Sequence, residues 1–383
     1  MNLIHQDIIN FIRKLYQTSE FIPLHAPTFV GNEKNYVLDC IDSTFVSSVG
    51  SYVTRFEQMI ADFTGAKYAI ATVNGTAALH VALKLVGVNL GDEVITQPLT
   101  FIATCNAIAY CGAKPIFVDV NRTTLGICPL SLLNFLTENT TQTELGCINK
   151  ATGKRIAAVL PMHTFGLPSQ IDEIVKICSQ FNIPCVEDAA ESLGSFYQGQ
   201  HTGTFGAIAT LSFNGNKTIT TGGGGMIITN NEALAIRAKH ITTTAKLPHK
   251  YEFVHDEIGY NYRLPNLNAA LGCAQMEVLP RLLASKRVIA LAYADFFKDS
   301  PYQFITEPAQ AHANYWLNAI ILNDQRERDA FLNDLNEAGV MSRPIWQLIS
   351  QLTMFEECQS VELTNARWLA ERVVNIPSSA KLS

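Results

Sequence analysis

The sequence lacks the features by which several classes of protein are recognised. It has no block of lysine and arginine, and its net charge at pH 7 is -6, which argues against a nucleic-acid or membrane-surface binder. Its nine cysteines contain no C-x-x-C pair, so we expect reduced thiols in a cytoplasmic protein without a metal site. No segment approaches a membrane span, and residues 1–16 predict an amphipathic helix rather than a signal peptide. Small-molecule partners are therefore expected.

Two common phosphate-binding motifs are also missing around Lys217. A P-loop needs glycine directly before its lysine and again five residues earlier, but Asn216 and Leu211 occupy these positions. The glycine run at 222–225 does not match G-x-G-x-x-G, because an isoleucine falls on the last position. The sequence therefore gives little support for an ATP or NAD site.

Residues 68–229 have the pattern of a mostly parallel sheet wrapped by helices. Short apolar runs alternate there with helical segments, and glycine, proline or polar clusters separate them. The predicted strands are residues 68–73, 93–97, 115–120, 156–160, 183–187, 208–213 and 226–229, and helices are predicted at 76–86, 101–111 and 171–181. In such α/β sheets the functional groups gather at the carboxyl ends of the strands.

The chain of 383 residues is long enough for two domains, and its texture changes near residue 248. Longer helices are predicted beyond this point, at 266–287, 326–338 and 365–374, with one clear strand at 315–322. We therefore expect a large domain over residues 1–248 and a smaller C-terminal α/β domain over 249–383. The polar stretch 137–154 predicts a surface loop or a hairpin.

Lys217 ends a short polar stretch that begins at Ser212 and precedes the glycine run at 222–225. A lysine at a strand end, near a hydroxyl and an acidic strand end, has the chemistry for a Schiff base with pyridoxal phosphate. Asp188 ends the predicted strand at 183–187, where a carboxylate is costly unless it has a partner such as a protonated pyridine nitrogen. The alternatives are an exposed loop lysine and a solvated strand end.

Further positions are candidates for contacts to this cofactor. Gly75 and Thr76 follow a predicted strand and begin a helix, so free N–H groups and a hydroxyl can hold a phosphate, although a plain helix cap explains the same pattern. Phe101 begins another helix, where its ring can stack on a flat cofactor or pack in the core. His163 follows the strand at 156–160 as a candidate contact, but a lone histidine is more often structural.

Taken in their order along the chain, the segments within residues 21–379 resemble those of the DegT/StrS-type nucleotide-sugar aminotransferases, a fold-type-I family that uses pyridoxal phosphate. The segments that carry the resemblance are 75–79, 100–101, 187–190, 212–217 and 259–263. The resemblance implies that Lys217 binds the cofactor covalently and that Asp188 pairs with the pyridine nitrogen. It further implies that Thr76 and Ser212 bind the phosphate and that Phe101 stacks on the ring.

The resemblance also implies a homodimer with shared active sites, in which Asn261 reaches the phosphate of the neighbouring subunit's cofactor. Glu191 is expected among the cofactor contacts, although the family often has His or Gln at this position. The family also often has an acid within the glycine run, where 222–225 has none. Both differences bear on the substrate rather than on the chemistry.

Within the family, residues 21–25, 31–34 and 42–50 look like the LegC branch, which serves legionaminic acid-type synthesis. This branch implies transfer of the amino group of glutamate to carbon 4 of a UDP-linked 4-keto-6-deoxy-N-acetylhexosamine. A perosamine-type enzyme that acts on a GDP-linked sugar is the main alternative. The known dehydratases of the same fold carry His where Lys217 stands, and the intact set of Lys217, Asp188 and Thr76 argues against a non-catalytic sensor.

Overall fold

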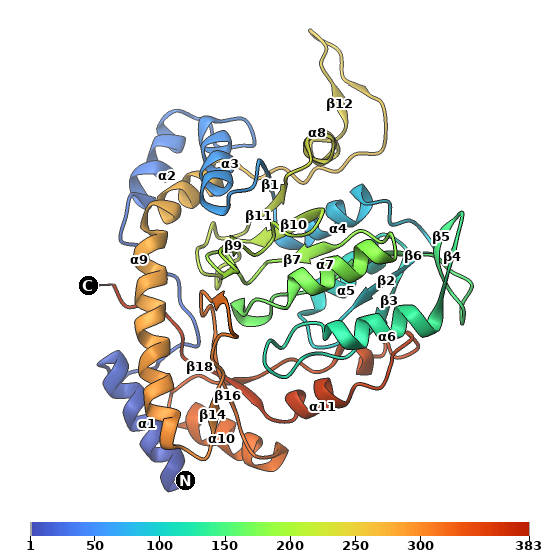
Figure 1. The fold of residues 1–383 in the computed structure, drawn as a ribbon. Coiled ribbons are helices and arrows are strands. Elements are labelled where there is room, and N and C mark those ends of the chain that lie inside the picture. The colour runs from blue at the N-terminus through green and yellow to red at the C-terminus, as the bar shows by residue number, and fades with distance from the viewer. Residues whose placement is uncertain (1, 383) are drawn as a thin grey trace.

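The strands of the large sheet run in the order β3-β2-β6-β7-β10-β11-β1 in the computed structural model, which describes residues 2–382 (Figure 1). Their bounds, in that order, are Lys114–Phe117, Glu93–Thr96, Ile156–Leu160, Val186–Asp188, Ile208–Ser212, Gly225–Thr229 and Tyr68–Thr72. β2 is parallel to β3 and β6, β7 is parallel to β10, and isolated parallel bridges join β6 to β7. β11 is antiparallel to both of its neighbours. The prediction of a mostly parallel sheet is confirmed.

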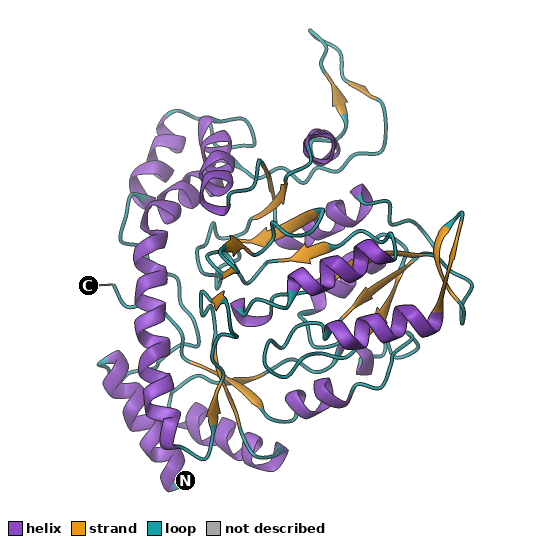
Figure 2. Cartoon of the chain, in the orientation of Figure 1, coloured by secondary structure: helices purple, strands orange, loops and turns teal. Residues whose placement is uncertain are grey.

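Helices cover both faces of this sheet (Figure 2). On one face, α4 (Gly75–Leu85), α5 (Ile102–Tyr110) and α8 (Glu232–Thr242) share an apolar core with the strands. On the other face lie α3 (Ser51–Thr64), α6 (Pro129–Asn139) and α7 (Ile171–Gln180). Successive strand residues alternate between the two cores, as Ile227 and Ile228 do, because side chains of a strand point to opposite faces. Both faces are therefore buried, which explains the continuous apolar runs in the sequence.

The 31-residue helix α9 (Asn266–Phe296) runs along one side of the molecule (Figure 1). It links the helices beside the large sheet to an apolar core formed by residues from near both ends of the chain. Its first half packs against α2 (Glu33–Asp42) and α3. In its second half, Ile289 and Tyr293 share a core with Ile8 and Ile12 of α1 (Leu3–Tyr16). The helix predicted at 266–287 is thus present but longer. The predicted amphipathic helix at the N-terminus is confirmed as α1, and residue 1 lies outside the described part of the chain.

A second, antiparallel sheet is built from the C-terminal part of the chain, in the order β14-β16-β18-β17. Its strands are Gln303–Phe304, Asn318–Ile321, Val373–Ile376 and Arg343–Pro344, and the helices here are α10 (Gln325–Glu337) and α11 (Thr364–Ala370). The prediction of a helix over 365–374 is wrong at its end, because Val373 and Val374 are buried strand residues that pair with β16. α1 belongs to the predicted large domain over residues 1–248, but it shares the apolar core of this C-terminal sheet. The division of the chain at residue 248 therefore stays a proposal.

Short elements complete the fold. β4 (Thr140–Thr143) and β5 (Gly146–Asn149) form a hairpin in the polar stretch where a loop or hairpin was predicted. β12 (Lys246–Leu247) and β13 (Val254–His255) form a hairpin that projects away from the rest of the chain (Figure 1). The other short elements are β8 (Phe196–Tyr197), β9 (Gln200–His201), β15 (Ala311–His312) and the 3-10 helices Thr164–Gly166, Phe297–Asp299 and Ile349–Gln351. Among residues 2–382, no helix has the length and apolar character needed to cross a membrane.

Candidate active site

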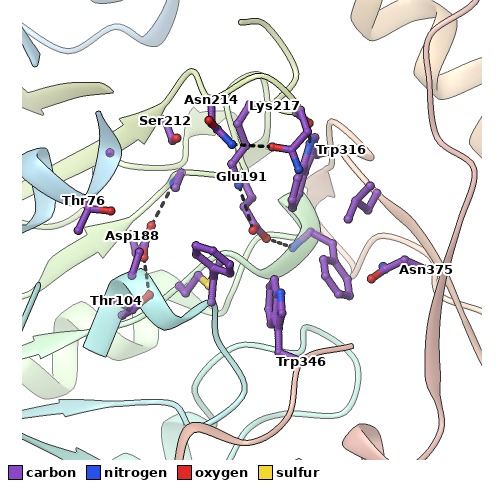
Figure 3. Close-up of a pocket in the computed structure, with 18 of the residues that line it drawn as sticks. Thr76, Thr104, Asp188, Glu191, Ser212, Asn214, Lys217, Trp316, Trp346 and Asn375 are labelled. Carbon is purple, nitrogen blue, oxygen red and sulfur yellow. Dashed lines mark hydrogen bonds and ion pairs between the residues drawn. The ribbon is translucent and has the colours of Figure 1, made fainter. Parts of the chain in front are cut away.

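One cavity of about 550 Å³ brings together most of the residues predicted for the site (Figure 3). It lies where β1, β7 and β10 end, the edge at which α/β sheets place their functional groups. The predicted residues that line it are Gly75, Thr76, Phe101, Asp188, Glu191, Ser212 and Lys217. Asn261 and His163 do not line this cavity.

Lys217 points into the cavity and pairs with Glu191. Its Nζ lies 3.2 Å from Oε1 of Glu191 and 3.8 Å from the centre of the Trp316 ring, and only 12% of its side chain is exposed. The alternative of an exposed loop lysine is therefore excluded. Glu191 also accepts a hydrogen bond from the backbone N–H of Phe165 at 2.8 Å. Burial raises the pKa of Glu191 to about 7, against the opposing effect of the Lys217 charge.

Asp188 is a buried carboxylate at the end of β7. It accepts hydrogen bonds from the Thr104 hydroxyl at 2.7 Å and from the backbone N–H of Ala190 at 3.2 Å (Figure 3). Burial raises its pKa, and these hydrogen bonds together with the charges of Lys217 and His163 partly offset the effect. No cationic side chain within residues 2–382 lies within 4 Å of it. A protonated ring nitrogen in the cavity fits this unpaired acid.

The start of α4 forms a close cradle beside β10. The Asn74 side chain caps the helix by accepting from the N–H of Ala77 at 2.7 Å, so the backbone N–H groups of Gly75 and Thr76 remain at the open helix end. A Cβ on Gly75 would lie 2.9 Å from Cβ of Ser212, so a side chain at residue 75 would close the cradle. Backbone N–H groups and two hydroxyls at a helix N-terminus suit a phosphate.

Phe101 is the residue before α5, and its side chain is not packed in the core. The residue is 49% exposed, lines the cavity, and has its ring centre 6.4 Å from that of Trp346. It is thus free to cover a flat ring. Thr104, which holds Asp188, lies one helical turn later, so one short helix supplies both groups.

The sequence model of the DegT/DnrJ/EryC1/StrS aminotransferase family matches residues 27–383. The chain belongs to this family. It is 37% identical over 364 residues to a protein named GDP-perosamine synthase from Escherichia coli O157:H7, with 95% of each chain covered. A GDP-perosamine synthase from Vibrio cholerae is 34% identical, with 93% and 94% covered. The crystal structure of the aminotransferase TlmJ from Streptoalloteichus hindustanus superposes with a TM-score of 0.86 at 26% identity, over 95% of each chain.

The protein is therefore a fold-type-I nucleotide-sugar aminotransferase, and pyridoxal phosphate is its cofactor. The cavity fits this group in three respects. The Gly75 cradle suits its phosphate, the unpaired Asp188 suits its ring nitrogen, and Lys217 suits its aldehyde. The roles of the individual residues stay predictions, because the family match does not test them.

His163 has a structural place in this aminotransferase rather than a place in the cavity. Its ring is fully buried, with Nε2 3.0 Å from a carboxylate oxygen of Glu187, and Nδ1 accepts from the backbone N–H of Ser169 at 3.2 Å. Glu187 also accepts backbone hydrogen bonds from Gly203, Phe205 and Gly206. The pair of His163 and Glu187 thus fixes the loop after β9 to β7, the strand that ends in Asp188.

Asn261 lies outside the cavity of its own chain. It is exposed, and its Oδ1 accepts from Nε of Arg263 at 3.2 Å. Its backbone pairs with Thr243, close to the base of the projecting hairpin. This position is compatible with a contact to another subunit, and the shared site stays a prediction.

Several residues of the cavity are not evident from the sequence. Thr104 could have been found, because it is one turn from Phe101 on a predicted helix. The others come from the C-terminal part of the chain and carry no local motif: Trp316, Arg343, Trp346 and Asn375. Trp316 donates its indole N–H to the carbonyl of Asn216 at 2.6 Å, which joins the second sheet to the segment of Lys217.

Proposed function

We propose that this aminotransferase transfers the amino group of glutamate to carbon 4 of GDP-4-keto-6-deoxymannose, as a perosamine-type enzyme for surface-glycan synthesis. The observation that carries the proposal is the similarity to two proteins named GDP-perosamine synthase, at 37% and 34% identity over nearly the whole length. This similarity favours the GDP-linked sugar over the UDP-linked sugar expected first. The LegC-type branch and a legionaminic acid product stay predictions without support from these relatives.

The roles proposed for the side chains follow from their positions. When bound, pyridoxal phosphate supplies an electron sink that stabilises negative charge on the substrate carbon. Asp188 holds the proton on the ring nitrogen, and its burial keeps water from replacing this interaction. Lys217 takes the proton from the α-carbon of glutamate in the first half-reaction and delivers a proton to carbon 4 of the sugar in the second. Thr76 and Ser212 hold the phosphate, and Phe101 covers the ring.

Glu191 has a further part in this scheme as the partner of Lys217. The two side chains form an ion pair in the cavity, and Glu191 is 2% exposed. A carboxyl group with a pKa of about 7 can share the proton that Lys217 releases or accepts. We therefore include Glu191 among the residues that hold the reacting proton.

We further propose that the enzyme is a homodimer whose two subunits share their active sites, and that it is located in the cytoplasm. Large apolar side chains are exposed on the projecting hairpin, at Tyr251 and Phe253, which supports an additional protein contact there. None of the nine cysteines is in a disulfide, as is typical of a reducing compartment.

The experiment that tests the substrate uses the enzyme in its pyridoxamine form. It is mixed with GDP-, UDP- and dTDP-linked 4-keto-6-deoxy sugars, and the return of the pyridoxal-form absorbance is followed. We expect the fastest return with GDP-4-keto-6-deoxymannose. A faster return with the UDP-linked N-acetylhexosamine would restore the first expectation and overturn the proposal.

A further inference from the structure

One wall of the cavity is formed by the small antiparallel sheet, and its side chains take no part in cofactor binding or proton transfer as proposed above. Arg343 of β17 and Asn375 of β18 both line the cavity and are direct partners across the two antiparallel strands. Partners in such a pair have their side chains on the same face, about 4.5–5.5 Å apart at Cβ. Figure 3 shows Asn375 on the opposite side of Glu191 from Thr76, so this wall lies away from the phosphate cradle.

Arg343 has its charge available for a ligand. No carboxylate within residues 2–382 lies within 4 Å of its guanidinium group, whereas Arg287 and Arg155 each pair with an acid. Its side chain makes one long hydrogen bond, of 3.5 Å, to the backbone carbonyl of Ser342. An arginine at a cavity wall without an acid partner is suited to bind an anion in bidentate fashion.

Asn375 adds an unsatisfied donor beside this charge. The residue is 3% exposed, and its amide nitrogen is buried without an acceptor among the described residues. A buried donor without a partner is unfavourable, because it has lost its hydrogen bonds to water. Half a turn about the last side-chain bond exchanges the amide nitrogen and oxygen, so the nitrogen can donate to a ligand in the cavity.

We propose that Arg343 and Asn375 bind a carboxylate of the amino-acid donor. The inference rests on the proposed function, in which glutamate and the sugar nucleotide occupy the same cavity in turn. Arg343 and Lys217 are the cationic side chains that line the cavity in residues 2–382, and Lys217 is needed for the covalent and proton-transfer steps. The donor's carboxylate is therefore left with Arg343, and the amide of Asn375 completes a site of three donors.

The diphosphate of the sugar nucleotide is a second anion that an arginine could bind. The planar fork of a guanidinium group matches a carboxylate and a phosphate alike. The pair lies on the wall of an otherwise largely apolar end that includes Trp346 and Ile345, where a singly charged carboxylate loses less hydration than a diphosphate. We assign the carboxylate, and the experiment separates the two anions because each half-reaction uses only one of them.

The two half-reactions are measured separately by stopped-flow absorbance on the loaded enzyme. Arg343→Gln, Arg343→Lys and Asn375→Leu are compared with Arg326→Gln, which removes an exposed arginine outside the cavity. For Arg343→Gln we expect the apparent dissociation constant of glutamate to rise roughly 10- to 100-fold, as for loss of a hydrogen-bonded charge. Arg343→Lys should lose less, and Asn375→Leu should raise the same constant roughly 5-fold or more.

The constant for the sugar nucleotide in the second half-reaction should change by less than about 3-fold in all four variants. An effect of Arg343→Gln on the sugar nucleotide alone, or none on glutamate, would overturn the assignment. If wild-type enzyme reacts with glutamate but not with the GDP-linked sugar, the proposed function is wrong. The glutamate half-reaction of the variants then still tests the carboxylate site. Circular dichroism and cofactor content show that each variant is folded and loaded.

Discussion

The ion pair between Glu191 and Lys217 leads to a prediction for the cofactor-free protein. Glu191 is 2% exposed, and burial raises its pKa from 4.5 to about 7. Between these two values the folded state binds a proton that the unfolded state has lost, so the free energy of unfolding falls as the pH rises. Each pKa unit corresponds to about 1.4 kcal/mol, and the full effect is therefore roughly 3 kcal/mol.

Glu191→Gln replaces the carboxyl group by a neutral amide of the same shape and removes this dependence. At pH 5, where the acid is protonated in the folded protein, the variant and the wild type should have similar stability. At pH 8 the variant should be more stable by up to roughly 3 kcal/mol, because the wild type then carries a buried carboxylate. The stabilising contribution of the protonated acid is thus present below about pH 4.5 and lost as the pH rises through about 7.

The measurement is urea unfolding of both cofactor-free proteins at several values between pH 5 and pH 8, followed by tryptophan fluorescence. Glu337→Gln, at an exposed position of α10, serves as the control for removal of a carboxylate as such. The quantity compared is the difference between variant and wild type at each pH, since other titrating groups cancel. A difference that stays constant over this range would refute the burial argument.

Four further predictions concern catalysis. Lys217→Ala should abolish transamination while the cofactor still binds through its phosphate and ring, measured by turnover and by cofactor content after gel filtration. Asp188→Asn should slow the glutamate half-reaction at least about 100-fold, measured in single turnovers. Thr104→Val removes the 2.7 Å hydrogen bond to Asp188 and should slow the same half-reaction roughly 10-fold in the same assay. Mixed dimers of Asn261→Ala and Lys217→Ala subunits, each nearly inactive alone, should recover activity if Asn261 serves the neighbouring site; no recovery would place it in its own subunit.

The central part of the site could be predicted because its signals are local. Gly75, Asp188 and Ser212 each follow or end a short apolar run, and parallel strands place such ends at one edge of a sheet. Strands, turns and helix starts are decided by residues that are neighbours in the sequence. The sequence pattern and the family resemblance therefore correctly predicted that these residues lie close together. The end of the helix predicted at 365–374 was missed because tertiary pairing of Val373 with β16 outweighed the local pattern.

The rest of the site depends on how separate parts of the chain pack. The sequence by itself determined the α/β class, the family, and the cluster of Lys217 with Asp188 at the sheet edge. Only the tertiary structure decided that Glu191 pairs with Lys217 and that Arg343 and Asn375 face the same cavity. Arg343 and Asn375 lie on strands of a second sheet, which α9 and α1 hold in position through an apolar core formed from both ends of the chain. Contacts between residues so far apart in sequence arise from this packing, and no local spacing encodes them.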